Sequence, residues 1–498
     1  MLRHTLAAAA VAALAAGCSF QPAFQRPVSP VADTFPAGPA YERSDAAPDA
    51  SGGRSAQGLP AADIGWRDFF ADARLQRVIE LALQNNRDLR TSILNVEAVR
   101  AQYLIARADL FPALDIDASA TRQRTPPSLA AAGRTQVRQY SVGLGASWEL
   151  DFFGRIRSLK DEALAQYLST AEARKSAELA LVAAVADQYL AVLAYDDLLA
   201  ITRNTLKTAQ ESFDITKLQF DTGTGSELDL RQAQSVVQQA QANLQSQLRL
   251  RAQAENALTL LVGQPLPADL PAGVALGDQN LLADIPAGLP SDLIARRPDI
   301  AAAEQALRAA NADIGAARAA FFPRISLTGS FGTLSPTLGG LFDSNSEAWS
   351  FVPQLTLPIF TGGAATAGYE LAKVRQRIEV ANYEKTIQTA FREVADGLAA
   401  RGTFDEQIRQ LAGLTDSQNR RLELSDLRYR NGVDSYLAVL TAQTDLYAAQ
   451  QSLISARLQR LTNLVDLYQA LGGGWLERTG DQPRPADTTA SGDVEAQK

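Results

Sequence analysis

The chain has 498 residues, with 55 acidic and 47 basic side chains and a formal net charge of -8. This balance provides no basic footprint, so we expect no nucleic acid among its partners. Its only histidine and its only cysteine, His4 and Cys18, lie near the N-terminus. Catalysis by Ser-His-Asp or Cys-His groups and zinc sites built on these residues are thereby excluded from the rest of the chain, and we expect no enzyme activity, no cofactor and no metal.

The N-terminus has the features of a secretory signal peptide. Arg3 and His4 precede an apolar run over residues 6–16, and small residues lead to Cys18. Residues 14–18 (Leu-Ala-Ala-Gly-Cys) are similar to a bacterial lipobox, although Leu14 lies one place farther from the cysteine than is usual. This pattern predicts a signal peptide over 1–17 and lipid attachment at Cys18, as an S-diacylglycerol and an N-acyl chain. The alternative is an ordinary signal peptide with a chance cysteine.

Beyond the signal peptide, the sequence favours strands as the elements that cross a membrane. No other apolar run reaches the roughly 18 residues of a membrane helix. Only a closed β-barrel then satisfies the backbone inside lipid. Residues 18–65 are rich in Pro, Ala, Gly and Ser and predict an extended, lipid-anchored segment.

The central part of the chain is a tandem repeat. A first copy spans 66–262, a second spans 291–472, a proline-rich linker at 263–290 joins them, and a tail follows at 473–498, polar from Gln482 onward. Four matches occur in the same order in both copies: 106–112 with 317–323, 150–154 with 357–361, 220–223 with 429–432, and 261–263 with 470–472.

Each copy predicts a helix, two strands, a long helix, a turn and a second long helix. The first helix of copy one spans Asp88 to Leu110 and stops at Pro112. Apolar and polar residues then alternate over 114–121 and 140–149, and again over 325–331 and 349–359, as outer-membrane strands do. Aromatic residues are expected near the strand ends, where membrane interfaces favour them; these are Tyr140, Trp148, Phe331 and Trp349.

Four strands cannot close a barrel, because about eight is the practical minimum. An open sheet edge cannot face lipid, so the strands of several chains must be combined. Three chains give twelve strands and two chains give eight, and the strand count alone leaves both open.

The long helices favour a hollow wall over a solid coiled coil. Residues 156–220 and 364–429 contain no proline, and at about 1.5 Å per residue each helix would be roughly 100 Å long. The shorter partners span 227–261 and 436–471. A solid coiled coil is the alternative, but glutamines on several faces between Gln232 and Gln253 fit a wall with a wet side better.

One stretch carries a specific family resemblance. Arg296-Arg297-Pro298-Asp299-Ile300, Ala309-Ala310-Asn311-Ala312 and Phe322-Pro323, with the lipobox and the tandem repeat, resemble the outer membrane factor (TolC-like) family, and within it the OprM/NodT-like lipoprotein branch of resistance-nodulation-division efflux systems. The resemblance covers residues from about Trp66 to Gly474. For the Arg-Arg-Pro-Asp motif itself we favour a structural role, because Pro298 suits a first helical turn and Asp299 the positive end of the helix dipole.

The resemblance implies an α+β fold in which a homotrimer forms a twelve-stranded outer-membrane β-barrel, continuous with a long periplasmic α-helical barrel. It implies a passive exit duct for drugs or other small toxic compounds. The implied partners are outer-membrane lipid, a periplasmic adaptor and an inner-membrane resistance-nodulation-division pump. Ducts for type I protein secretion or heavy-metal export remain alternatives, as does a trimeric adhesive stalk. The chain does not reveal the substrates.

Two helix-helix turns, at 222–226 and 431–435, are expected at the periplasmic tip. Glycine permits the tight backbone, and serine suits the N-cap of the following helix. The end of a long helix is also the surface that an adaptor would reach first. We therefore predict adaptor contact there, the alternative being a plain turn; the residues are Gly223, Gly225, Ser226, Gly432 and Ser435.

The helix after the second turn carries a polar stripe. At 100° per residue, small and acidic residues fall within about 40° of one direction, opposite Val439, Leu440, Tyr447 and Ile454. A water-filled tunnel needs such a stripe, and rings of aspartate would favour cations, whereas the alternative is a solvated outer face. The stripe comprises Asp434, Ala438, Thr441, Asp445, Ala448 and Ser452.

The gate expected from the resemblance is altered. Where the OprM-like branch commonly has Asp-Ala-Gln-Arg, this chain has Thr441-Ala442-Gln443-Thr444, and both charges are absent. Asp445, one turn beyond Thr441, is a substitute. A branch-typical gate leucine matches Leu437. The pore or gate candidates are therefore Asp434, Leu437, Thr441 and Asp445.

Overall fold

The structure is a computed structural model that describes residues 20–42, 59–124, 126, 128, 136–282, 285–286, 288 and 290–481. The signal peptide, Cys18 and the tail after residue 481 lie outside the described residues. The chain divides into two compact units, and each is described by itself. The sheet unit comprises Met1–Val28, Leu94–Glu172 and Ala302–Lys385; the helical unit comprises Ser29–Ile93, Ala173–Ala301 and Thr386–Lys498.

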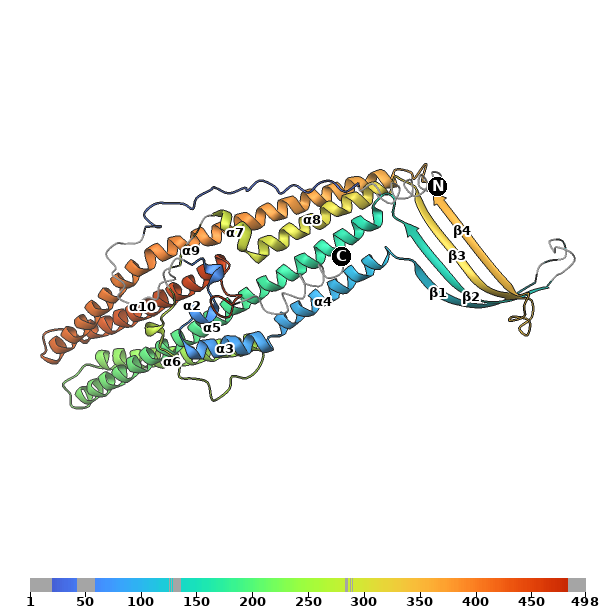
Figure 1. Ribbon diagram of the computed structural model, residues 1–498. Coiled ribbons are helices and arrows are strands. Elements are labelled where there is room, and N and C mark those ends of the chain that lie inside the picture. Colours follow the sequence, from blue (N-terminus) through green and yellow to red (C-terminus); the bar gives the residue numbers. More distant parts are fainter. Residues whose placement is uncertain are drawn as a thin grey trace. The chain divides into compact units, whose positions relative to one another are not determined.

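The predicted duplication is confirmed element by element. The helices before the strands, α4 (Arg87–Ala108) and α8 (Pro298–Ala319), have 22 residues each. The long helices α5 (Arg155–Asp221) and α9 (Ala364–Arg430) have 67 residues each. Their partners α6 (Glu227–Val262) and α10 (Tyr436–Ala470) have 36 and 35 residues and return beside them as helical hairpins (Figure 1).

The sheet unit contains one antiparallel sheet in the order β1-β2-β3-β4, as Figure 1 shows. Its strands are β1 (Ala113–Arg124), β2 (Gln136–Leu150), β3 (Arg324–Ser335) and β4 (Glu347–Thr356). All four overlap the predicted strands. The prediction that the last strand extends to Ile359 was wrong, because β4 ends at Thr356, just before Leu357 and Pro358. Phe331 and Tyr140 are a second correction: β3 continues to Ser335 and β2 begins at Gln136, so both rings lie inside their strands.

The register gives the sheet one apolar and one polar face. Residues directly opposite each other in an antiparallel pair project to the same face. Ser119 and Ser141 therefore share a face, and their Oγ atoms are 2.8 Å apart. One row across the apolar face is Ile116, Leu144, Phe331 and Trp349; the adjacent row across the polar face is Asp117, Gly143, Gly332 and Ala348.

The core of the helical unit is built on aromatic rings. The Phe69 ring stacks on Tyr468 with centroids 4.0 Å apart, and the Tyr468 hydroxyl donates to the Ile64 carbonyl at 2.6 Å. Residues after α10 return to this core, where the Trp66 amide donates to the Leu476 carbonyl at 2.9 Å. The shorter helices are η1 (Ala61–Asp63), α2 (Trp66–Phe69), α3 (Ala73–Asn85), η4 (Leu276–Asp278) and α7 (Pro290–Arg296).

The Arg-Arg-Pro-Asp motif joins three segments of the helical unit. Pro298 begins α8, as predicted. The buried Arg297 guanidinium contacts Asp299 at 2.6 Å and Glu393 at 2.9 Å, and donates to the Ala470 carbonyl at 2.8 Å. Arg297 therefore fastens the start of α8 to α9 and to the end of α10, which supports the structural role.

One expectation about hydropathy needs correction. Among the described residues, α5 contains an 18-residue window that is apolar enough to cross a membrane by length and composition, with a mean hydropathy of 1.6. Charged residues interrupt this window, so it does not stand out as an uninterrupted apolar run in the sequence. Packing against other helices also accounts for the apolar residues of this window, since 56% of the window is buried inside the structure.

Candidate functional site

The two predicted turns end α5 and α9 with a left-handed glycine. Gly223 has φ +77° and Gly432 has φ +71°, a conformation that suits the residue after a helix C-cap. Gly225 is required for a different reason, because a Cβ there would lie 3.0 Å from the Phe220 backbone nitrogen. Gly223 and Gly432 are therefore confirmed as turn glycines, while adaptor contact at all three glycines stays a prediction.

The two serines at these turns behave differently. The Ser226 hydroxyl accepts from the Asp229 amide at 3.1 Å and donates to the Asp229 carboxylate at 2.8 Å. Ser435 occupies the N-cap of α10, but its side chain caps no backbone amide. The prediction of a side-chain cap was wrong for Ser435. The neighbouring Asp434 is instead held by an arginine of α9.

Behind the turns, the two hairpins pack on each other through a hydrophobic cluster. Tyr436 is almost fully buried in it, and the Tyr429 hydroxyl donates to the Gln219 side-chain oxygen at 3.0 Å. Farther along, the hydroxyls of Thr202 and Tyr447 lie 2.8 Å apart. The cluster comprises Ala233, Tyr436, Val439 and Leu440, with Phe213, Val236, Leu422 and Tyr429 packed against it.

The polar stripe of α10 is accessible and its opposite face is packed. Thr441, Ala448 and Ser452 are exposed, whereas Val439, Leu440 and Ile454 are buried. Leu437 is exposed, and the Thr441 hydroxyl donates to its carbonyl at 2.9 Å. The predicted division into two faces is confirmed for these residues, whereas Asp434, Ala438, Asp445 and Tyr447 are all half-buried. A role for the stripe in the pore stays a prediction.

Both aspartates of the stripe form ion pairs with α9. Arg428 binds Asp434 through two contacts of 2.5 and 3.0 Å, and Arg421 binds Asp445 at 2.6 Å. The Arg428 guanidinium accordingly lowers the pKa of Asp434. Within one chain, both aspartates are therefore paired with arginines, while their arrangement in rings stays a prediction.

These arginines lie on α9, so the spacing of residues within α10 could not reveal them. One signal was present: Arg421 and Asp445 lie at equal distances from the ends of α9 and α10, as facing residues of an antiparallel hairpin do, whereas Asp434 lies in the turn itself.

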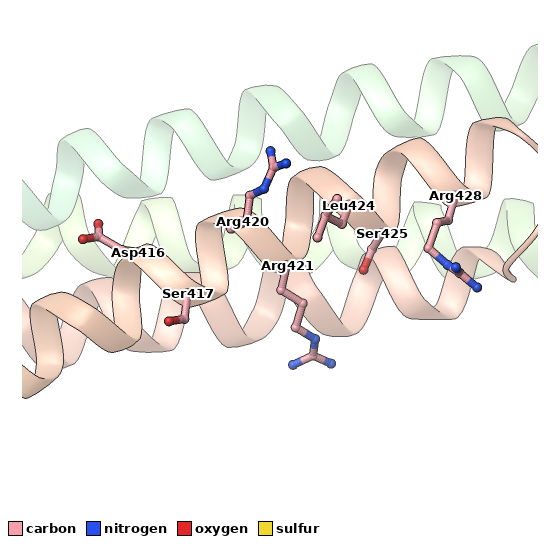
Figure 2. Close-up of a pocket in the computed structure, with 7 residues that line it drawn as sticks. All are labelled: Asp416, Ser417, Arg420, Arg421, Leu424, Ser425 and Arg428. Carbon is pink, nitrogen blue, oxygen red and sulfur yellow. The ribbon is translucent and has the colours of Figure 1, made fainter.

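The same arginines line a shallow groove on α9 (Figure 2). Two ridges of residues spaced four apart form it, and its volume is about 590 Å³. Arg421 and Arg428 extend from one side of the helix in Figure 2, and Arg420 from the other. The lining residues are Asp416, Ser417, Arg420, Arg421, Leu424, Ser425 and Arg428.

Asp187 of α5 is a largely buried acid in the helical unit. Burial, reinforced by the Asp466 carboxylate, raises the pKa of Asp187 to about 8. Its Oδ1 atom has no hydrogen-bond partner among the described residues. The folded chain therefore holds a proton that an unfolded aspartate, with a pKa of about 3.9, releases.

Stability should consequently fall as the pH rises from about 4 to about 8, because unfolding releases this proton over that window. We expect the Asp187→Asn variant to lose part of this slope and to melt at a higher temperature than the parent at pH 9. Thermal unfolding from pH 5 to 9 measures both. An unchanged slope in the variant would show that Asp187 ionises normally.

Comparison with known proteins gives consistent matches along the chain. The family model described as outer membrane efflux protein matches residues 78–264 and 289–473. The antibiotic efflux pump outer membrane protein ArpC and the toluene efflux pump outer membrane protein TtgC of Pseudomonas putida are each 48% identical over 488 residues, covering 98% of this chain and 99% of theirs. The open-state MtrE outer membrane channel of Neisseria gonorrhoeae matches with a TM-score of 0.81 at 40% identity, covering 93% of this chain and all of that one.

Proposed function

We infer that the chain, which belongs to the outer membrane efflux protein family, is an outer-membrane channel protein of an efflux pump. On this basis we propose that it is the trimeric, lipid-anchored exit duct of a tripartite pump, and that it conducts small toxic compounds passively. The observation that carries the proposal is a four-stranded sheet, apolar on one face and polar on the other, connected directly to long helical hairpins.

The sheet edges require that several copies of the chain be joined, and the family favours three. Among the described strands, β1 and β4 each pair on one side only. In lipid these edges must be joined, and joining β4 of one copy to β1 of the next closes twelve strands with three copies. The apolar face then contacts lipid, and the polar face lines the lumen.

A lipid anchor at Cys18 fits the position of the residues that follow it. The Phe20 ring stacks on Phe322 with centroids 4.4 Å apart, and Phe322 lies just before β3. The Pro22 carbonyl accepts from Asn311 at 2.8 Å, and Arg26 pairs with Glu304 at 2.7 Å. The chain after Cys18 is therefore held along α8, with its first described residue beside the strand ends, where an acyl chain would enter the outer membrane.

The tips of the hairpins are the proposed contact for a periplasmic adaptor, which in turn joins an inner-membrane resistance-nodulation-division pump. Exposed apolar side chains gather around both turns, as at sites that await a protein partner. A tip that faced only water would not need them. They are Leu218 and Leu228 at the first turn, and Leu427, Val433 and Leu437 at the second.

The substrate class is proposed from the relatives, whose names specify antibiotics and toluene. Deleting the gene, with the partner pump expressed, should sensitise cells to both kinds of compound, and a plasmid copy should restore resistance. Unchanged susceptibility across many compounds would contradict drug or solvent export. A defect limited to a secreted protein or to metal tolerance would support the alternative ducts.

A charge variant tests whether the α10 stripe lines the pore. The Arg421→Ala variant leaves Asp445 without its partner, so the pore should gain negative charge and a severalfold preference for cations over anions. Reversal potentials in planar bilayers under a salt gradient measure this preference.

Two controls accompany this variant. Arg409→Ala removes an arginine that pairs with Glu406 within α9, and it should leave the selectivity unchanged. Adding Asp445→Asn to Arg421→Ala should restore the parental value. A reversal potential that does not move in Arg421→Ala would place Asp445 outside the pore.

A further inference from the structure

Within one chain, a stack of aromatic rings closes the seam between the two repeats at the ends of β2 and β3. Phe153 follows β2, Phe322 precedes β3, and their ring centroids are 5.1 Å apart. Phe20 adds a third ring to the stack. These residues lie beside the last pairs of the β2-β3 ladder, which ends at Leu150 opposite Ile325.

The repeat places the same two rings at the outer edges of the sheet unit. Phe360 follows β4 as Phe153 follows β2, and Phe111 precedes β1 as Phe322 precedes β3. Phe360 is 91% exposed and Phe111 is 63% exposed. Each copy of the chain therefore carries one ring beside each outer edge of its sheet, Phe111 beside β1 and Phe360 beside β4. These two rings do not stack on each other within one copy.

We propose that Phe360 of one subunit stacks on Phe111 of the partner subunit, so that the internal β2-β3 seam is repeated between β4 and β1 of two subunits. This rests on the trimer proposed above and specifies its contacts. The seam between subunits has two rings where the internal seam has three, because the single N-terminal segment of each chain occupies the internal seam.

The sheet register supports this pairing independently. Glu149 lies opposite Ser326 in the internal seam, and the repeat maps this pair onto Thr356 and Asp115 of the partner subunit. Thr356 and Asp115 both project from the polar face of their own strands. The pairing thus keeps the two faces continuous across the boundary, whereas a slip of one residue would exchange them.

The helices beside the strands show the same relation. Ala316 of α8 is 8% exposed, whereas its counterpart in α4, Ile105, is 69% exposed and projects an apolar side chain. Gly315 cannot carry a Cβ, which would lie 2.9 Å from the Gln21 Cα. The counterpart of Gly315 in α4 is Leu104, which is 47% exposed. In the proposed seam between subunits, no N-terminal segment occupies the space beside Leu104. The α4 surface is therefore shaped for a second copy of this chain.

Cross-linking of paired cysteines tests the proposal, because Cys18 is the only native cysteine and the proposed lipid anchor would block its thiol. The F111C/F360C double variant, treated with a short bismaleimide in assembled particles, should yield covalent species of two and three times the subunit mass. The matched F153C/F322C variant should be linked within one chain and yield no higher mass. F111C/F342C combines opposite ends of the sheet and should give no product.

The outcomes separate this proposal from the trimer itself. Particles that do not have three times the subunit mass before cross-linking would overturn the trimer. Trimeric particles in which F153C/F322C reacts and F111C/F360C does not would overturn the aromatic pairing. If the double variant fails to assemble, differently tagged F111C and F360C chains are co-expressed, and a covalent product carrying both tags is expected; mixed trimers without it would contradict the pairing.

Discussion

Replacing Arg297 with alanine should lower the free energy of unfolding by about 1.5–3 kcal/mol, because its buried guanidinium donates hydrogen bonds to charged partners, while those carboxylates are 31% and 39% exposed and stay partly solvated. Asp299 and Glu393 would lose their shared cation, and the Ala470 carbonyl would lose its donor. Thermal or denaturant unfolding of the purified protein measures the loss. In cells, the amount of assembled protein in the outer membrane should fall with it.

The adjacent residue provides a matched control. Arg296 pairs with Asp63 at 2.7 Å, but both side chains are largely exposed. Exposed pairs contribute about 0–1 kcal/mol, so Arg296→Ala should be close to the parent. Equal losses in the two variants would mean that the pair at Arg297 is not buried in the assembled protein.

The Gly332→Ala variant should prevent most of the protein from assembling a barrel. A Cβ at this position would lie 2.3 Å from the Gly143 Cα and 2.3 Å from the Val142 carbonyl oxygen. Both obstacles are backbone atoms, so relief requires β2 and β3 to separate where they are paired in register. The yield of heat-resistant oligomer on gels measures the effect.

Gly329 on the same strand is the control for this experiment. A Cβ there would meet the Ser350 carbonyl oxygen at an ordinary 3.7 Å. Gly329 projects to the apolar face, so its added methyl group would contact lipid, and Gly329→Ala should assemble normally. Normal assembly of Gly332→Ala would show that the close approach of Gly143 and Gly332 is not required.

Local and periodic features were predictable from the sequence. The alternation over 114–121 and 140–149 led to the strands, because a half-buried strand has a period of two. The left-handed glycines at 223 and 432 follow from the same local chemistry that ends most helices. Because the chain is duplicated, the lengths of the helices in the first copy predict the lengths of the corresponding helices in the second copy.

Features that depend on pairing between distant segments were not predictable. To predict the ion pairs of Asp434 and Asp445, one must know which residues of α9 lie opposite which residues of α10. The spacing of the stripe residues along α10 does not contain this information. Likewise, the composition of the N-terminal segment indicated an extended tether, whereas its attachment to α8 depends on a space that Gly315 leaves and on rings that Phe153 and Phe322 provide.

The central claim is that three copies of this chain enclose a conducting pore. Single-channel recording of purified, lipidated protein of trimeric mass in planar bilayers tests it most directly. If three copies enclose a pore, discrete conductance steps are expected, one for each inserted particle. The preference for cations should increase in Arg421→Ala. Inserted trimers that carry no current under any salt gradient would contradict the account and would favour the adhesive stalk.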